Sequence, residues 1–121
     1  MNWQRFRHFH LTHPDNIRSI LSAGLLANEA GDIFLATSPA VLENIARDQL
    51  FLTEAALFGV YSRGLTGQKL PDDVAELTAK YHVRLRQPHV ASRFLRFVGV
   101  IRVREETEWD RWIRNAAVVT R

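Results

Sequence analysis

The chain changes its hydrophobic period at a single proline near its start. Residues 5–12 alternate between two sides, and this two-residue period predicts a β-strand. Pro14 follows, and proline is well tolerated as the first residue of a helix. The apolar residues after it recur at helical spacing up to Gly24, namely Ile17, Ile20 and Leu21. We therefore expect a strand, a tight turn and a helix whose apolar side packs on the sheet.

A second segment repeats this design. Residues 32–37 form a short apolar run that predicts a strand, and Ser38-Pro39 is typical of a helix start. The residues expected on the inner side of that helix are Val41, Leu42, Ile45 and Ala46. We expect the strands at 6–12 and 32–37 to be neighbouring parts of one sheet.

The remaining elements follow from local patterns. The expected helices lie at 53–62 and 71–81, with a helical turn at 108–113, a loop at 64–69 and a break at Pro88. The expected strands lie at 93–103 and 116–120. The order β-α-β-α-α-α-β-β predicts an α/β (α+β) fold. A length of 121 residues is that of one domain, so we take 1–121 as a single domain.

Composition excludes several classes of protein. No apolar run approaches the roughly 20 residues that a membrane helix needs, and the start is polar and aromatic rather than a secretory signal. We therefore expect a cytoplasmic protein without a membrane partner. The chain has no cysteine, which excludes disulfides and thiolate metal sites. The formal net charge is +3, and all but two of the 16 basic residues are arginine. Arginine suits bidentate phosphate recognition, although a GC-rich genome would also favour it.

Three of the five histidines lie close together, at His8, His10 and His13. A metal site is disfavoured, because no carboxylate or cysteine nearby completes a ligand set. A histidine or threonine beside a turn can also act as a local cap, so the residue types alone leave a structural role open.

The same stretch carries a family resemblance. The run Phe9-His10-Leu11-Thr12-His13, followed by Asn16-Ile17, Ile20-Leu21 and Gly24-Leu25, resembles the first motif of the DarT-type nucleic-acid ADP-ribosyltransferase toxins. It resembles the RNA 2′-phosphotransferases of the same fold more loosely. Residues 33–39 (IFLATSP) are similar to the second strand and helix start of that fold. The resemblance covers about the first 50 residues and implies an ADP-ribosyltransferase-like split sheet with packed helices.

The resemblance also implies a reaction and its residues. NAD would be the substrate, and a nucleic acid, DNA or RNA, the acceptor. His10 would hold the NAD ribose with support from Thr12, and Asn16 would help to orient a ribose or phosphate. Tyr61 and Phe58 are candidates for stacking on nicotinamide, although both also fit a core.

Cleavage of the nicotinamide–ribose bond passes through an oxocarbenium-like state, which a carboxylate must stabilise. The resemblance implies a catalytic glutamate near the start of a late strand. The expected last strand contains no glutamate, so the nearest acids are Glu105, Glu106 and Glu108. Glu106-Thr107-Glu108 matches a Glu-x-Glu pattern of the superfamily, which makes Glu108 and Glu106 the catalytic candidates. A solvated acidic loop is the structural alternative.

Two other functions stay open. A diverged, non-catalytic module of the same fold would bind a nucleotide, a nucleic acid or a protein. An RNA 2′-phosphotransferase would also use NAD and would need arginines on the RNA phosphate. The candidates for that contact are Arg5, Arg7, Arg93, Arg96 and Arg102.

Overall fold

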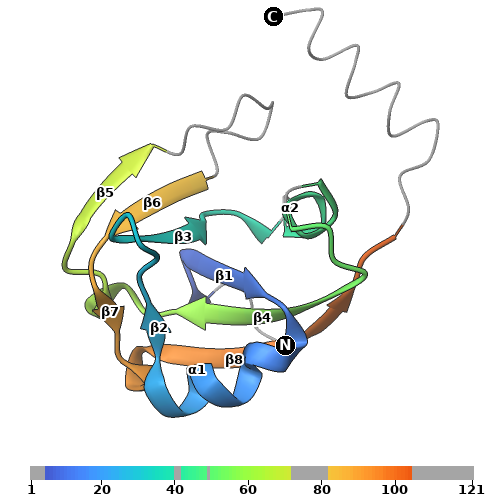
Figure 1. Cartoon of the computed structure of the whole chain (residues 1–121), viewed down its shortest axis with the longest axis horizontal. Coiled ribbons are helices and arrows are strands. Elements are labelled where there is room, and N and C mark those ends of the chain that lie inside the picture. The colour runs from blue at the N-terminus through green and yellow to red at the C-terminus, as the bar shows by residue number, and fades with distance from the viewer. Residues whose placement is uncertain (1–4, 40–41, 49, 72–81, 105–121) are drawn as a thin grey trace, which may run out of the picture.

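A computed structural model describes residues 5–39, 42–48, 50–71 and 82–104. Its main element is a six-stranded antiparallel sheet with the strand order β5-β6-β3-β1-β4-β8 (Figure 1). The strands are β1 (His8–Thr12), β3 (Asp32–Ala36), β4 (Glu54–Val60), β5 (Gln68–Pro71), β6 (His82–Arg86) and β8 (Leu95–Arg102). A second sheet pairs β2 (Leu25–Leu26) with β7 (His89–Val90). The described α-helices are α1 (Ile17–Ala23) and α2 (Leu42–Asp48).

The sheet is split between β1 and β3. These two strands share the single register pair Phe9↔Ala36. By contrast, β1 pairs with β4 from His8 to Thr12, and β3 pairs with β6 along its whole length. Two three-stranded halves, β5-β6-β3 and β1-β4-β8, therefore meet at one pair and diverge beyond it.

Each face of the sheet has its own apolar core. Alternate residues of β4 point to opposite faces, because side chains of a strand alternate. Phe58 packs in the cluster that holds Ile20 of α1, and Leu57 packs in the cluster that holds Leu42 of α2. The two helices therefore cover opposite faces of the sheet, and β4, between β1 and the edge strand β8, is buried on both sides.

The first predicted unit is largely confirmed. The predicted strand begins at His8, and β1 and β3 are neighbours in one sheet. Residues 14–16 form a 3₁₀ turn, and α1 then continues to Gly24, whose φ of +82° ends the helix. A Cβ on Gly24 would collide with the Val90 carbonyl oxygen, so the residue also permits close packing of β7. The predicted burial of Leu21 is wrong: Ile20 is 7% exposed but Leu21 is 49% exposed, since it lies 100° further round the helix.

The predicted helix at 53–62 is wrong, because these residues form β4 and the start of a 3₁₀ turn at Ser62–Gly64. A strand that is buried on both faces shows no alternation of apolar and polar residues. Its sequence pattern therefore does not distinguish it from a buried helix. The predicted loop at 64–69 ends earlier than expected, since β5 begins at Gln68.

The other predicted boundaries need smaller corrections. Residues 93–94 belong to a 3₁₀ turn rather than to β8, and Pro71 belongs to β5. The rest of the predicted helix at 71–81, the helical turn at 108–113 and the strand at 116–120 lie outside the described residues. The result is a mixed α/β fold dominated by antiparallel sheet. Within the described ranges, neither α-helix has the length or apolar character to cross a membrane.

Candidate functional site: a cleft at the split in the sheet

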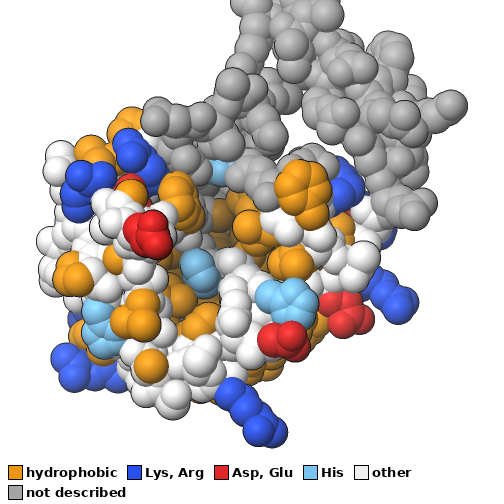
Figure 2. Space-filling view, viewed as in Figure 1, with side chains coloured by type: hydrophobic (Ala, Val, Ile, Leu, Met, Phe, Trp, Pro, Cys, Tyr) orange, Lys and Arg blue, Asp and Glu red, His pale blue; other side chains and the backbone are white. Residues whose placement is uncertain are grey.

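A cleft with two compartments opens where the sheet splits. The larger, which we call the α2-side compartment, has a volume of about 530 Å³. The smaller, the α1-side compartment, has a volume of about 320 Å³. His10 and Thr12 line both compartments. Figure 2 shows a hollow in this face of the molecule, with hydrophobic side chains and a histidine inside it. The larger volume falls in the roughly 300–1,000 Å³ range of small-molecule sites.

The imidazole of His10 bridges the two halves of the sheet. Its Nδ1 lies 2.9 Å from the main-chain oxygen of Phe34 on β3. A carbonyl oxygen only accepts, so Nδ1 carries the proton and donates it. Burial lowers the pKa of His10, and the bond to Phe34 offsets part of that effect. The ring is therefore neutral near pH 7, and its Nε2 is the acceptor nitrogen left for a ligand.

Two further polar side chains border the α1-side compartment beside His10. Asn16 Nδ2 donates to Thr12 Oγ1 over 2.8 Å, which fixes the threonine hydroxyl at the end of β1. The Thr12 hydroxyl hydrogen then remains as a donor. The structure thus brings together His10, Thr12 and Asn16, the three residues of the first motif that we expected at a ribose or a phosphate.

His13 caps the turn that follows β1. Its Nδ1 accepts from the Asp15 backbone N–H over 3.0 Å at the start of the 3₁₀ turn. This bond stabilises the sharp connection between β1 and α1. His13 also lines the α2-side compartment, so it combines a capping role with a place at the cleft.

The turn after α2 forms the apolar wall of the α2-side compartment. Leu50 and Leu52 line it and are tied to the helix by backbone bonds to Ile45 and Ala46. Between them Phe51 has a φ of +54° and is 83% exposed. Left-handed backbone is unfavourable for a residue with a side chain, so this turn stores local strain at the cleft.

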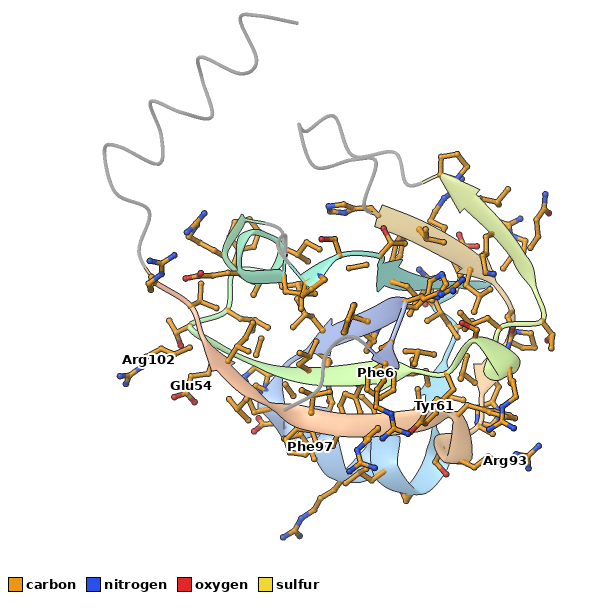
Figure 3. All side chains as sticks on the ribbon, turned by 180° about the vertical axis from the view of Figure 1, so that it is seen from behind. Phe6, Glu54, Tyr61, Arg93, Phe97 and Arg102 are labelled. Atoms are coloured by element: carbon orange, nitrogen blue, oxygen red, sulfur yellow. The ribbon has the colours of Figure 1, made fainter. Side chains whose placement is uncertain are left out.

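The predicted nicotinamide-stacking residues lie elsewhere. Phe58 is fully buried, with its ring centroid 5.5 Å from that of Phe97. Tyr61 packs on Phe6, with ring centroids 5.1 Å apart, and both are labelled in the view from behind (Figure 3). Neither lines a compartment. The structure therefore does not bring Phe58 or Tyr61 together with the polar residues of the cleft.

His8 differs from His10 although both lie on β1. Its Nδ1 is buried and has no hydrogen-bond partner among the described residues. Burial lowers the pKa of His8, and the charges of Lys69 and Arg7 lower it further. His8 lines neither compartment. Within the described ranges no three histidine or acidic side chains are grouped to hold a metal ion.

The acidic candidates Glu105, Glu106 and Glu108 lie outside the described residues. Among the described residues that line the two compartments, none is an aspartate or a glutamate. The described part of the cleft therefore offers hydrogen-bonding groups and apolar walls but no carboxylate.

Sequence reasoning missed His82, Arg84 and Arg86. His82 is buried and lines the α2-side compartment from β6. The alternation in His82-Val83-Arg84-Leu85-Arg86 would have predicted a strand with these three polar residues on one face. The arginines proposed for RNA contact do not line either compartment: Arg5, Arg7, Arg93, Arg96 and Arg102 are all exposed.

No protein-family model, curated protein or solved structure matches this chain.

Proposed function

We propose that the cleft binds NAD and that the protein transfers ADP-ribose from NAD to a nucleic acid. The observation that carries this proposal is the position of His10. This residue of the first motif lines both compartments and keeps Nε2 as an acceptor for a ribose hydroxyl. Thr12 and Asn16 add a hydroxyl and an amide beside it.

The shape of the cleft supports a ligand with two ends. NAD carries two nucleosides joined by a flexible pyrophosphate, and the two compartments lie on either side of His10 and Thr12. The split between β1 and β3 also supports the ADP-ribosyltransferase-like fold that the resemblance implies. We propose that fold for the chain.

The reaction breaks the bond between the ribose C1′ and the nicotinamide nitrogen. Nicotinamide leaves with the bonding electron pair, and a nucleophilic atom of the nucleic acid forms the new bond at C1′ and loses its proton. A ribose hydroxyl would donate to His10 Nε2, and the Thr12 hydroxyl would donate to a ribose oxygen, so that the two residues orient the sugar. The positive charge that develops on the ribose requires a carboxylate, and we propose Glu108, with Glu106, for that role.

A non-catalytic nucleotide-binding module is the second candidate. The observation that favours it is the lack of a carboxylate among the described residues lining the cleft. This module would bind NAD through the same three polar residues and release no nicotinamide.

One experiment separates these candidates. The purified chain is titrated calorimetrically with NAD, then incubated with NAD and DNA or RNA oligonucleotides while free nicotinamide and oligonucleotide mass are measured. Binding with nicotinamide release and a mass gain of one ADP-ribose supports the transferase. Binding without release supports the module, and failure to bind NAD contradicts both.

A further inference from the structure

Two arginines, Arg84 and Arg86, lie next to the α2-side compartment, on the face of β3 and β6 that borders it. Phe34 and His82 line the compartment, and Arg84 is the register partner of Phe34. Cross-strand partners place their Cβ atoms about 5 Å apart, so Arg84 stands directly beside the lining residue Phe34. Arg86 comes two residues later on the same face, opposite Asp32.

Asp32 holds both guanidinium groups. Its side chain is 3% exposed, and Arg86 binds it through Nε at 3.1 Å and a terminal nitrogen at 3.4 Å. Arg84 places a terminal nitrogen 3.5 Å from the second carboxylate oxygen and donates Nε–H to the Pro71 carbonyl over 3.1 Å. The two side chains are therefore fixed before any ligand arrives, which reduces the entropy lost on binding.

The cluster keeps an excess of positive charge. One carboxylate neutralises only one of the two guanidinium groups. Each guanidinium has five N–H donors, and the contacts with Asp32 and Pro71 use only some of them. The side chain of Arg84 is 26% exposed and that of Arg86 is 51% exposed, so donors remain accessible. Paired guanidinium donors match the geometry of a phosphate group, with which they form bidentate hydrogen bonds.

We propose that Arg84 and Arg86 form a phosphate-binding subsite beside the α2-side compartment. This inference rests on the proposed function, because it assigns the subsite to a phosphate of a ligand that reaches the cleft. The phosphate comes either from the NAD pyrophosphate or from the backbone of the nucleic acid. Asp32 acts as the positioning residue for both guanidinium groups.

The direct test uses the wild-type protein and sodium pyrophosphate. The Nε–Hε NMR signals of the arginines are followed during the titration, with the exposed Arg18 of α1, which covers the opposite face of the sheet, as the reference. We expect the signals of Arg84 and Arg86 to shift saturably and at lower pyrophosphate concentration than the signal of Arg18. If they shift no more than the Arg18 signal, the subsite is contradicted, whether or not the protein binds NAD.

Variants then identify the source of the phosphate. Arg84→Gln and Arg86→Gln are compared with Arg18→Gln, which removes the same charge from an exposed position on α1. A loss of about tenfold in NAD affinity by calorimetry assigns the subsite to the pyrophosphate, and the same loss in oligonucleotide affinity by anisotropy assigns it to the nucleic acid. Equal affinities in all three variants overturn the inference and leave NAD binding by the wild type intact. A wild type that binds pyrophosphate but not NAD contradicts the proposed function and not the subsite.

Discussion

The Nδ1 atom of His10 lies 2.9 Å from the main-chain oxygen of Phe34, across two strands that share a single register pair. The His10 side chain thus binds the Phe34 carbonyl where β1 and β3 no longer pair through their backbones. This bond fixes the ring tautomer and leaves Nε2 as the acceptor, so one interaction both bridges the split and prepares the residue for a ligand.

Replacing His10 is expected to affect binding more than folding. His10→Ala removes the Nε2 acceptor from both compartments, and we expect the affinity for NAD to fall about tenfold or more. The melting temperature should stay within a few degrees, because the ring is half-buried at a cleft. Calorimetry and thermal unfolding measure the two effects. His8→Ala is the control on the same strand and should leave NAD affinity unchanged; equal losses in both variants would contradict the role of His10.

The lowered pKa of His10 predicts a pH dependence of stability. Since burial lowers its folded-state pKa below the ordinary value of about 6.5, the unfolded chain binds the proton more readily. The free energy of unfolding should therefore fall as pH decreases below about 6.5 and be fully retained above it. His8 has the same direction of shift and adds to the effect.

The matched variant for this test is His10→Asn, which keeps an N–H donor for the Phe34 carbonyl but does not titrate. Urea unfolding between pH 7.5 and pH 5 should show a smaller loss of stability in this variant than in the wild type. An identical pH dependence in both proteins would show that His10 titrates normally.

Adjacent positions of α1 are expected to differ sharply in their effect on stability. Ile20 is 7% exposed in the core, so Ile20→Ala should lower the free energy of unfolding by about 2–5 kcal/mol. Leu21 is 49% exposed, so Leu21→Ala should change it by less than about 1 kcal/mol. Chemical denaturation measures both values, and a larger loss for Leu21 would contradict the placement of α1.

The Gln87 side chain joins the connection between β4 and β5 to β7. Its Oε1 accepts from the backbone N–H groups of Thr66 and Gly67 over 2.8 Å each, and its Nε2 donates to the carbonyls of Gly64 and His89 over 2.8 and 2.7 Å. Gln87→Ala leaves these four groups without their partner and should cost about 2 kcal/mol or more. The exposed neighbour variant Gln68→Ala should cost less than about 0.5 kcal/mol in the same denaturation assay.

The sequence predicted the parts of the fold that have clear periodicity. The alternation at 8–12 and the proline-led helix with Ile20 are in the structure as expected. The apolar run of β4 carries no period because both faces are buried, so the predicted helix there was wrong. Short edge strands such as β5 depend on pairing with β6, a contact that local sequence does not encode.

Only the residues of the candidate site that lie in one short segment of the sequence could be predicted. His10, Thr12 and Asn16 lie within seven residues, and the turn between strand and helix brings them together. Tyr61 and His82 are distant in sequence, and their places depend on strand order. For this reason we predicted Tyr61 at the site although it packs on Phe6, and we did not predict His82, which lines the α2-side compartment.

The catalytic proposal depends on Glu108. Glu108→Gln should reduce nicotinamide release by about 10²-fold or more, because a neutral amide does not stabilise the developing positive charge. Release is measured by chromatography at saturating NAD. Glu54→Gln, at an exposed position on β4, is the control and should retain the wild-type rate. Full activity of Glu108→Gln, with the fold intact, would remove this residue from the mechanism.

The most direct test of NAD binding at the cleft follows the imidazole NMR signals of His10 during a titration with NAD. We predict a saturable shift of the His10 signals that is larger than the shift of His8, since His10 lines both compartments and His8 lines neither. Signals of both histidines that stay unmoved at millimolar NAD would contradict the proposal that this cleft binds NAD.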